Sequence, residues 1–285
     1  MDKNLIIGGF TRYGINELKP WVLSAKEHGG ENCDVVLCAG ETTEETTKWL
    51  EEQGVIVFPM AKNNSIPIHV YRFLYIYEYL RNFWANYHYV VVTDVKDVYF
   101  QKSPFDFFET AFDSPGNLSL VIAGEALRYQ DEPWGNDNLF KSYGPYVHGL
   151  FKNMPIYNVG TFGGRSDYVM DMVFHIFTNA INRPIPICDQ AVFNVLINTQ
   201  PFKSVVVPSY HWACEAGTVA DPTKINDFRP NLLCPEPVFQ DGLVKTHDQY
   251  VYPIVHQYDR VPEWKKFVQE KFGQQDDSGS FIYKV

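Results

Sequence analysis

The sequence has 285 residues and a formal net charge of −10 at pH 7, with 45% hydrophobic and 20% charged residues. This composition is typical of a globular protein with a large core. Binding to a nucleic-acid backbone needs a basic face, so the charge argues against a nucleic-acid partner, although it leaves room for one small phosphate compound.

Neither a disulfide framework nor an export signal is evident. The five cysteines are an odd number, and no two of them have Cys-x-x-Cys spacing, which is typical of a protein from a reducing compartment. The N-terminal apolar run is too short for a signal peptide or an anchor, and no stretch of about 18 apolar residues occurs. We therefore expect a soluble cytoplasmic protein without a membrane anchor.

The first part of the chain alternates between two kinds of segment. Strands are predicted at residues 4–10, 33–40, 55–60 and 89–94, and helices at residues 15–29, 42–54 and 69–87. The strands are continuous apolar runs, as in a parallel sheet that is covered on both faces. Alternation of strand and helix predicts right-handed β-α-β units, and therefore an α/β fold. In such sheets, ligands lie beyond the carboxyl ends of the strands.

The second part of the chain is more mixed. Further strands are predicted at residues 118–126, 157–164 and 202–209, and helices at residues 167–181 and 189–200. Residues 128–156 are rich in Gly, Pro, Asn and aromatic residues, and we predict a long site-forming loop there. No shift of composition marks a second domain, so we expect one domain over residues 1–270, followed by a polar tail over residues 271–285.

Two aspartates, Asp94 and Asp97, stand at the end of the strand predicted at 89–94. If the chain turns there, their carboxylates converge on an oxygen site that suits a divalent cation whose other ligands are substrate phosphates. The alternative is a solvated turn, with Lys96 as the neighbouring charge. His256 follows a late apolar run, and if it reaches the acids, the mixed oxygen and nitrogen set suits manganese better than calcium.

The segment VVVTDVKDVYFQKSPF around these aspartates resembles the Asp-x-Asp region of nucleotide-sugar glycosyltransferases with the GT-A fold. YNVGTFGG resembles the strand that faces the donor sugar, and CDQAVFNVLI resembles the Asp-Gln helix start of the glycogenin-like and retaining galactosyltransferase group. IVHQYDR resembles the segment that carries the late histidine of the metal shell. IIGGFTRYG occupies the position of the family's first strand and base-binding loop. HVYRFLYIYEYL matches the helix whose basic residue, here Arg72, points toward the donor. Each motif is short, but together they cover roughly residues 4–262 in the family's order.

The resemblance implies a GT-A, Rossmann-like, mostly parallel sheet flanked by helices, with a nucleotide-binding half at 1–105 and a donor-sugar and acceptor half at 106–270. It also implies roles for particular residues. Nucleotide and donor binding would fall to Gly9, Phe10, Thr11, Tyr13, Arg72, Thr93, Asp94, Val95, Asn158, Val159 and Gly160; metal binding to Asp94, Asp97 and His256; and catalysis to Asp189 and Gln190.

One departure from the family concerns the aspartates, which are spaced Asp-x-x-Asp rather than Asp-x-Asp. Either Asp97 is the principal metal ligand while Asp94 contacts the ribose or a metal-bound water, or both bind the metal. We favour Asp97 as the firmer ligand, because the apolar residues after it match the family best. Asp189 has a structural alternative as the cap of the helix predicted at 189–200.

The function implied by the resemblance is transfer of a hexose or pentose from a nucleoside diphosphate sugar, expected to be a UDP-sugar, to a glycan or other hydroxyl acceptor. The cofactor would be Mn²⁺ or Mg²⁺, and the Asp-Gln pair favours a retaining enzyme, whereas in an inverting enzyme Asp189 would be the base. Because many eukaryotic members of the group are membrane-anchored in the Golgi, the expected lack of an anchor predicts a microbial or viral origin. Aromatic faces suit sugar rings, so the acceptor platform is expected at Trp134, Tyr143, Tyr146 and His148. The alternatives are a nucleotidyltransferase that makes nucleotide sugars and a non-catalytic sugar-nucleotide-binding protein with the same fold.

Overall fold

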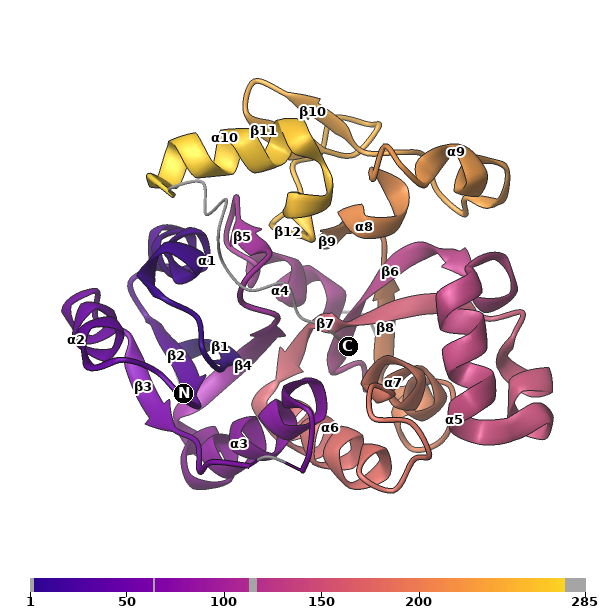
Figure 1. The fold of residues 1–285 in the computed structure, drawn as a ribbon, viewed down its shortest axis with the longest axis horizontal. Coiled ribbons are helices and arrows are strands. Elements are labelled where there is room, and N and C mark those ends of the chain that lie inside the picture. Colours follow the sequence, from indigo (N-terminus) through magenta and orange to yellow (C-terminus); the bar gives the residue numbers. More distant parts are fainter. Residues whose placement is uncertain (1–2, 64, 113–116, 275–285) are drawn as a thin grey trace.

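The computed structural model describes residues 3–63, 65–112 and 117–274. These residues form one α/β domain around a mostly parallel seven-stranded sheet (Figure 1). Its strands are β1 (Lys3–Phe10), β2 (Cys33–Ala39), β3 (Ile56–Pro59), β4 (Tyr87–Thr93), β6 (Leu120–Arg128), β7 (Pro155–Arg165) and β8 (Val206–Ser209). The flanking helices are α1 (Ile15–His28), α2 (Glu44–Glu52), α3 (Ile68–Phe83), α4 (Asp106–Phe112), α5 (Pro133–Phe151), α6 (Ser166–Ala180) and α7 (Asp189–Ile197). The predicted fold class is confirmed.

The strand order is β3-β2-β1-β4-β7-β6-β8. Neighbouring strands are parallel except at β7, which runs antiparallel to both β4 and β6. The start of β7 therefore lies at the edge where β4 and β6 end. This reversal brings Gly160 beside Asp94, whose backbone N–H donates to the Gly160 carbonyl oxygen at 2.8 Å.

Alternate residues of the central strands face two different apolar layers. Leu5 and Ile7 pack with α3, α6 and α7 on one face, whereas Ile6 packs with α1 and α2 on the other. A strand that is buried on both faces favours apolar side chains at successive positions. This double burial explains the continuous apolar runs from which the sheet was predicted.

Residues 128–156 are not the predicted long loop, and that expectation is wrong. They contain the end of β6, a short helical turn, α5 and the start of β7. Pro133 opens α5, and the Glu132 carboxylate caps it by accepting hydrogen bonds from the backbone of Trp134 and Gly135. Gly144, with φ of 75°, divides α5 into two helical halves. Pro133 therefore starts a helix and Gly144 bends it, so residues that are common in loops belong to a helix here.

Two small sheets lie on one side of the domain, and except for β5 they come from the C-terminal part of the chain, which is drawn from orange to yellow in Figure 1. One sheet has the order β5-β12-β9 and the other pairs β10 with β11. Their elements are β5 (Val98–Phe100), β9 (Ala213–Glu215), β10 (Val238–Gln240), β11 (Leu243–Lys245), β12 (Ile254–His256), α8 (Ala216–Val219), α9 (Ile225–Phe228) and α10 (Pro262–Phe272). The helix α10 includes the first two residues of the expected polar tail, and residues 275–285 of that tail lie outside the described residues.

Candidate metal centre and its surroundings

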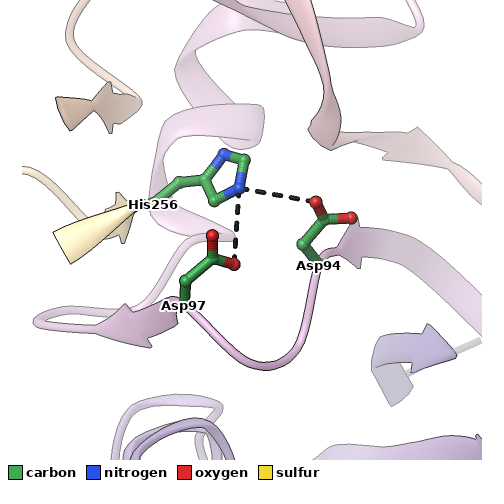
Figure 2. Close-up of side chains that lie close together, drawn as sticks. All are labelled: Asp94, Asp97 and His256. Carbon is green, nitrogen blue, oxygen red and sulfur yellow. Dashed lines mark ion pairs between the residues drawn. The ribbon is translucent and has the colours of Figure 1, made fainter. Parts of the chain in front are cut away.

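The turn at residues 94–97 joins β4 to β5, and thus joins the central sheet to a small one (Figure 2). Its start is fixed by the hydrogen bond from Asp94 to Gly160, and its end by the Asp97 carbonyl oxygen, which accepts from the Gln257 N–H at 2.7 Å. Both carboxylates consequently point to the same side of the turn, toward His256. The convergence expected of Asp94 and Asp97 is present.

His256 reaches these acids because of strand register. In the small sheet, His256 pairs with Val98 of β5 and with Glu215 of β9. Its Nε2 lies 3.5 Å from Asp94 Oδ2 and 3.6 Å from Asp97 Oδ1 (Figure 2). The imidazole is buried, and within the described part of the chain its Nε2 has no hydrogen-bond partner.

The three side chains fit a divalent cation. One ligand atom from each lies within 4.8 Å of the other two, and the set combines carboxylate oxygens with an imidazole nitrogen. Such a mixed set suits a metal like manganese. A buried polar nitrogen that no hydrogen bond satisfies is costly in a purely structural role. The geometry therefore favours a metal centre over a solvated turn.

Without a metal, the surroundings of His256 favour the protonated, positively charged form of its ring. Burial disfavours the charged ring, but the carboxylates of Glu215 and Asp97 outweigh burial and raise the pKa of His256 to about 9. The imidazolium then supplies the positive charge between the two aspartates. A cation would replace that charge, because a metal binds the neutral ring and releases its proton.

Arg72 lies on α3 and is buried. Its guanidinium forms an ion pair with Asp94 and lies 3.5 Å from Asp189 Oδ2. Burial lowers the pKa of Arg72, and Asp189 opposes this effect. Asp189 is the first residue of α7, whose N-cap is Cys188, so it pairs with Arg72 rather than capping the helix. Gln190 follows it on the same helix.

The start of β7 adds an amide to this region. Asn158 Oδ1 accepts from the Gly160 N–H at 2.7 Å, and Asn158 Nδ2 donates to Glu125 Oε1 at 2.8 Å. A Cβ on Gly160 would lie 2.7 Å from the His256 ring and 2.8 Å from Asp94 Oδ2. Glycine is therefore required where the backbone passes the metal centre. The neighbouring Val159 packs in the core.

Sequence reasoning missed two buried carboxyl groups, Glu125 and Glu215. Burial is the largest cause that raises the pKa of Glu125 to about 8, and repulsion from Glu215 adds to it. Glu215 contacts His256 Nδ1 at 2.6 Å. In LVIAGEALR, the sequence pattern that could have pointed to Glu125 is an acid near the end of an apolar segment. The same pattern is common at strand ends that are exposed to solvent, so it does not identify a buried acid.

The expected nucleotide-binding residues gather at the end of β1. The rings of Phe10 and Tyr13 stack with centroids 6.3 Å apart, and Lys96 Nζ lies 5.6 Å from the Tyr13 centroid, so Tyr13 is beside the turn at 94–97. Thr11 Oγ1 accepts from the Glu41 N–H at 3.2 Å. A Cβ on Gly9 would lie 2.7 Å from Arg72 Cβ, so this glycine allows α3 to approach the strand.

Two expected donor-binding residues have side chains with structural partners. Thr93 Oγ1 accepts from Trp21 Nε1 at 2.7 Å. Val95 is buried in the apolar layer that contains α1. If these residues contact a donor, the contact must come from their backbone.

The expected acceptor residues lie on α5. Trp134 and Tyr146 are exposed. The guanidinium of Arg183 covers the Tyr143 ring at 3.9 Å, and His148 Nε2 contacts Asn136 Oδ1 at 2.7 Å. These two contacts lie within α5 and between α5 and Arg183, and neither of them joins the expected acceptor residues to the metal centre.

Comparison with known proteins bears on the fold. No protein-family model matches the sequence, and a search of curated proteins finds no match. Among solved structures, the chain is similar to the apo structure of WbbM, a bifunctional glycosyltransferase, with a TM-score of 0.59 and 12% sequence identity. The chain therefore shares its fold with that structure. The likeness covers 97% of this chain but only 50% of that protein, so the chain spans about half of its length.

The described residues include no helix whose length and apolar character would let it span a bilayer.

Proposed function

We propose that the chain is a metal-dependent glycosyltransferase of the GT-A type. The observation that carries the proposal is the convergence of Asp94, Asp97 and His256 at the carboxyl end of the central sheet, in a glycosyltransferase fold. The donor would be a nucleoside diphosphate sugar, with UDP as the proposed nucleotide. The acceptor would be a glycan or another hydroxyl compound, and the anomeric configuration would be retained.

Transfer breaks the bond between the sugar C1 and a diphosphate oxygen, and forms a bond from C1 to the acceptor oxygen. Asp94, Asp97 and His256 would hold Mn²⁺ or Mg²⁺, which when bound supplies a Lewis acid for the departing diphosphate. Negative charge grows on the diphosphate and positive charge on the sugar ring. In a retaining reaction without a dedicated base, the acceptor proton leaves to the departing diphosphate oxygen.

The remaining residues would bind and orient the donor. Asn158 and the Gly160 backbone would contact the sugar, with the Asn158 amide held by Glu125. Asp189 would accept hydrogen bonds from sugar hydroxyl groups, and Gln190 would lie near C1, where a polar group suits the positive character of the ring. Arg72 would act mainly by holding Asp94 and Asp189 in place, and its positive charge would add fixed electrostatic stabilisation.

The test is a donor screen. Release of nucleoside diphosphate is measured over a panel of nucleotide sugars, with each donor supplied with Mn²⁺ and then with a chelator. We expect metal-dependent release from at least one donor, and its loss in Asp97→Asn. Asp137→Asn is the matched control, since Asp137 is an exposed residue of α5 that pairs with Lys141.

The outcomes separate the candidate functions. Metal-dependent donor binding without release would favour a non-catalytic sugar-nucleotide-binding protein. Release of pyrophosphate from a nucleoside triphosphate and a sugar phosphate would favour a nucleotidyltransferase. An absence of metal-dependent binding and turnover across the panel, or full activity in Asp97→Asn, would contradict the proposal.

A further inference from the structure

Glu215 ends β9 and is buried with both carboxylate oxygens engaged. Its Oε2 lies 2.6 Å from His256 Nδ1, on the side of the ring away from the aspartates. Its Oε1 accepts a hydrogen bond from Thr161 Oγ1. The carboxylate is therefore fixed from two directions.

Strand register accounts for this arrangement. Glu215 and His256 are paired residues of the parallel strands β9 and β12, so their side chains leave the small sheet side by side. Thr161 belongs to β7 of the central sheet and pairs with Thr93, the residue before Asp94. Glu215 thus connects the strand that carries the histidine to the strands that place Asp94.

The hydrogen bonds of Glu215 determine which nitrogen of His256 can bind a metal. An ionised carboxylate only accepts hydrogen bonds, so Nδ1 must carry the proton that lies between the two groups. The other nitrogen, Nε2, is then the one directed at Asp94 and Asp97. In metal sites generally, a hydrogen bond to the distal nitrogen of a ligating histidine fixes its tautomer and ring orientation.

We infer that Glu215 is a positioning residue that holds His256 with Nε2 toward the metal. The inference rests on the proposed metal-dependent function. It assigns Glu215 no contact with the donor or the cation. The competing explanation is that Glu215 acts through its negative charge alone, or that it only stabilises the fold.

Three substitutions separate position from charge. Glu215→Gln keeps the reach of the side chain, because its amide can accept from Nδ1 and donate to Thr161, but it removes the charge. Glu215→Asp keeps the charge but is one methylene too short to contact His256 and Thr161 together. Glu132→Gln is the control, since Glu132 also accepts two hydrogen bonds, at the start of α5.

The primary measurement is Mn²⁺ affinity, obtained by titration with detection of free Mn²⁺ by electron paramagnetic resonance. We expect Glu215→Asp to weaken binding about 10- to 100-fold, as other losses of a histidine's supporting partner do. Glu215→Gln should weaken it clearly less, and Glu132→Gln should match the wild type. Equal affinity in Glu215→Asp and the wild type, or a larger loss in Glu215→Gln than in Glu215→Asp, would overturn the inference.

A second measurement does not depend on the cation. The Nδ1–H signals of His256 in the metal-free wild type should indicate a hydrogen bond to Glu215, and Glu215→Asp should shift them. Thr161→Val supplies a further variant if substitutions of Glu215 do not fold; it removes one anchor of the carboxylate and should weaken Mn²⁺ binding. Unchanged affinity in Thr161→Val together with unchanged His256 signals in the Glu215 variants would refute positioning.

Failure of the two proposals can be told apart. If the wild type binds no Mn²⁺, the proposed metal function fails and the role of Glu215 in it fails too. If the wild type binds Mn²⁺ and releases nucleoside diphosphate while Glu215→Asp binds equally well, only the positioning role fails.

Discussion

Arg72 is a buried cation whose surroundings are acidic. Removing a guanidinium from water is costly unless carboxylates replace the lost hydration, and Asp94 and Asp189 do so here. Asp189 is itself buried, so each partner depends on the other. Arg72 therefore stabilises the fold in addition to its proposed role in the site.

Substitution of Arg72 by methionine should therefore destabilise the protein strongly. Breaking a buried ion pair on one side leaves an uncompensated charge, and we expect a loss of about 3 kcal/mol in the free energy of unfolding. Urea denaturation measures it. Arg81→Met is the control, because Arg81 is an exposed residue paired with Glu78, and its loss should cost less than about 1 kcal/mol. Similar losses in both variants would contradict the structural role of Arg72.

Glu125 should make stability depend on pH. Burial raises its pKa to about 8 in the folded protein, whereas an unfolded chain titrates near the usual value of about 4.3. Between these values the unfolded chain loses a proton that the folded protein keeps, so the free energy of unfolding falls as pH rises through this window.

The test is Glu125→Gln, which keeps an acceptor for Asn158 and cannot ionise. At pH 8 the variant should be more stable than the wild type by up to about 5 kcal/mol, since the pKa differs by about 3.7 between the folded and unfolded states and each pKa unit corresponds to about 1.4 kcal/mol. The difference should shrink toward pH 5, and thermal denaturation at several pH values measures it. A difference that stays constant across the range would mean that Glu125 does not titrate as described.

At the scale of elements, local sequence was sufficient wherever burial or capping left a local signal. The continuous apolar runs of β1, β2 and β4 predicted strands, and Thr43 caps α2 within the segment predicted as a helix at 42–54. The helix α5 was predicted as a loop because it contains Gly144 and Pro145. These residues bend the helix here, but Gly and Pro are also common in loops. The reversed direction of β7 left no signal, since its residues are apolar in either direction.

The candidate site was predicted only in part for a similar reason. Asp94 and Asp97 are close in sequence, and strand geometry places them at the sheet edge. The contact of Glu215 with His256 and Thr161 depends on the register of strands from two sheets, which no local pattern encodes. The same holds for the pairing of Arg72 with Asp189.

The β7 backbone at Gly160 should tolerate no side chain. A Cβ there would lie 2.9 Å from Asn158 Oδ1 in addition to its clashes with His256 and Asp94. We expect Gly160→Ala to weaken Mn²⁺ binding at least tenfold, because the ligands must move apart, and titration of Mn²⁺ measures it.

The control is Gly149→Ala, on an exposed turn of α5 where an added Cβ would meet nothing within 4 Å. Alanine is the better helix former, so this variant should keep wild-type affinity and gain up to about 1 kcal/mol of stability. Retention of wild-type affinity in Gly160→Ala would show that the metal centre is less closely packed than its geometry indicates.

For the whole molecule, a bound cation would join two sheets. Asp94 and Asp97 bracket the turn that leaves the central sheet, whereas His256 belongs to the small one. A ligand that binds only the folded protein stabilises it, by about 2.7 kcal/mol at a concentration one hundred times its dissociation constant. Mn²⁺ should therefore raise the melting temperature, and a chelator should reverse the rise.

Asp97→Asn should show little of this shift, whereas Asp137→Asn should show all of it. Calorimetry with and without Mn²⁺ provides the comparison. An equal rise in wild type and Asp97→Asn would place the bound Mn²⁺ elsewhere on the protein.

The separation of the ligands along the chain also bears on biosynthesis. A ribosome makes both aspartates long before it adds His256, and chains fold from the N-terminal side as they emerge. The nascent central sheet could gather Asp94 and Asp97, but the third ligand and its partner Glu215 would still be missing. The cation would then be acquired late, after β12 has joined β9 and β5. A chain that terminates before β12 would keep the acidic turn but lack the imidazole, so premature termination would yield a protein without its complete metal site.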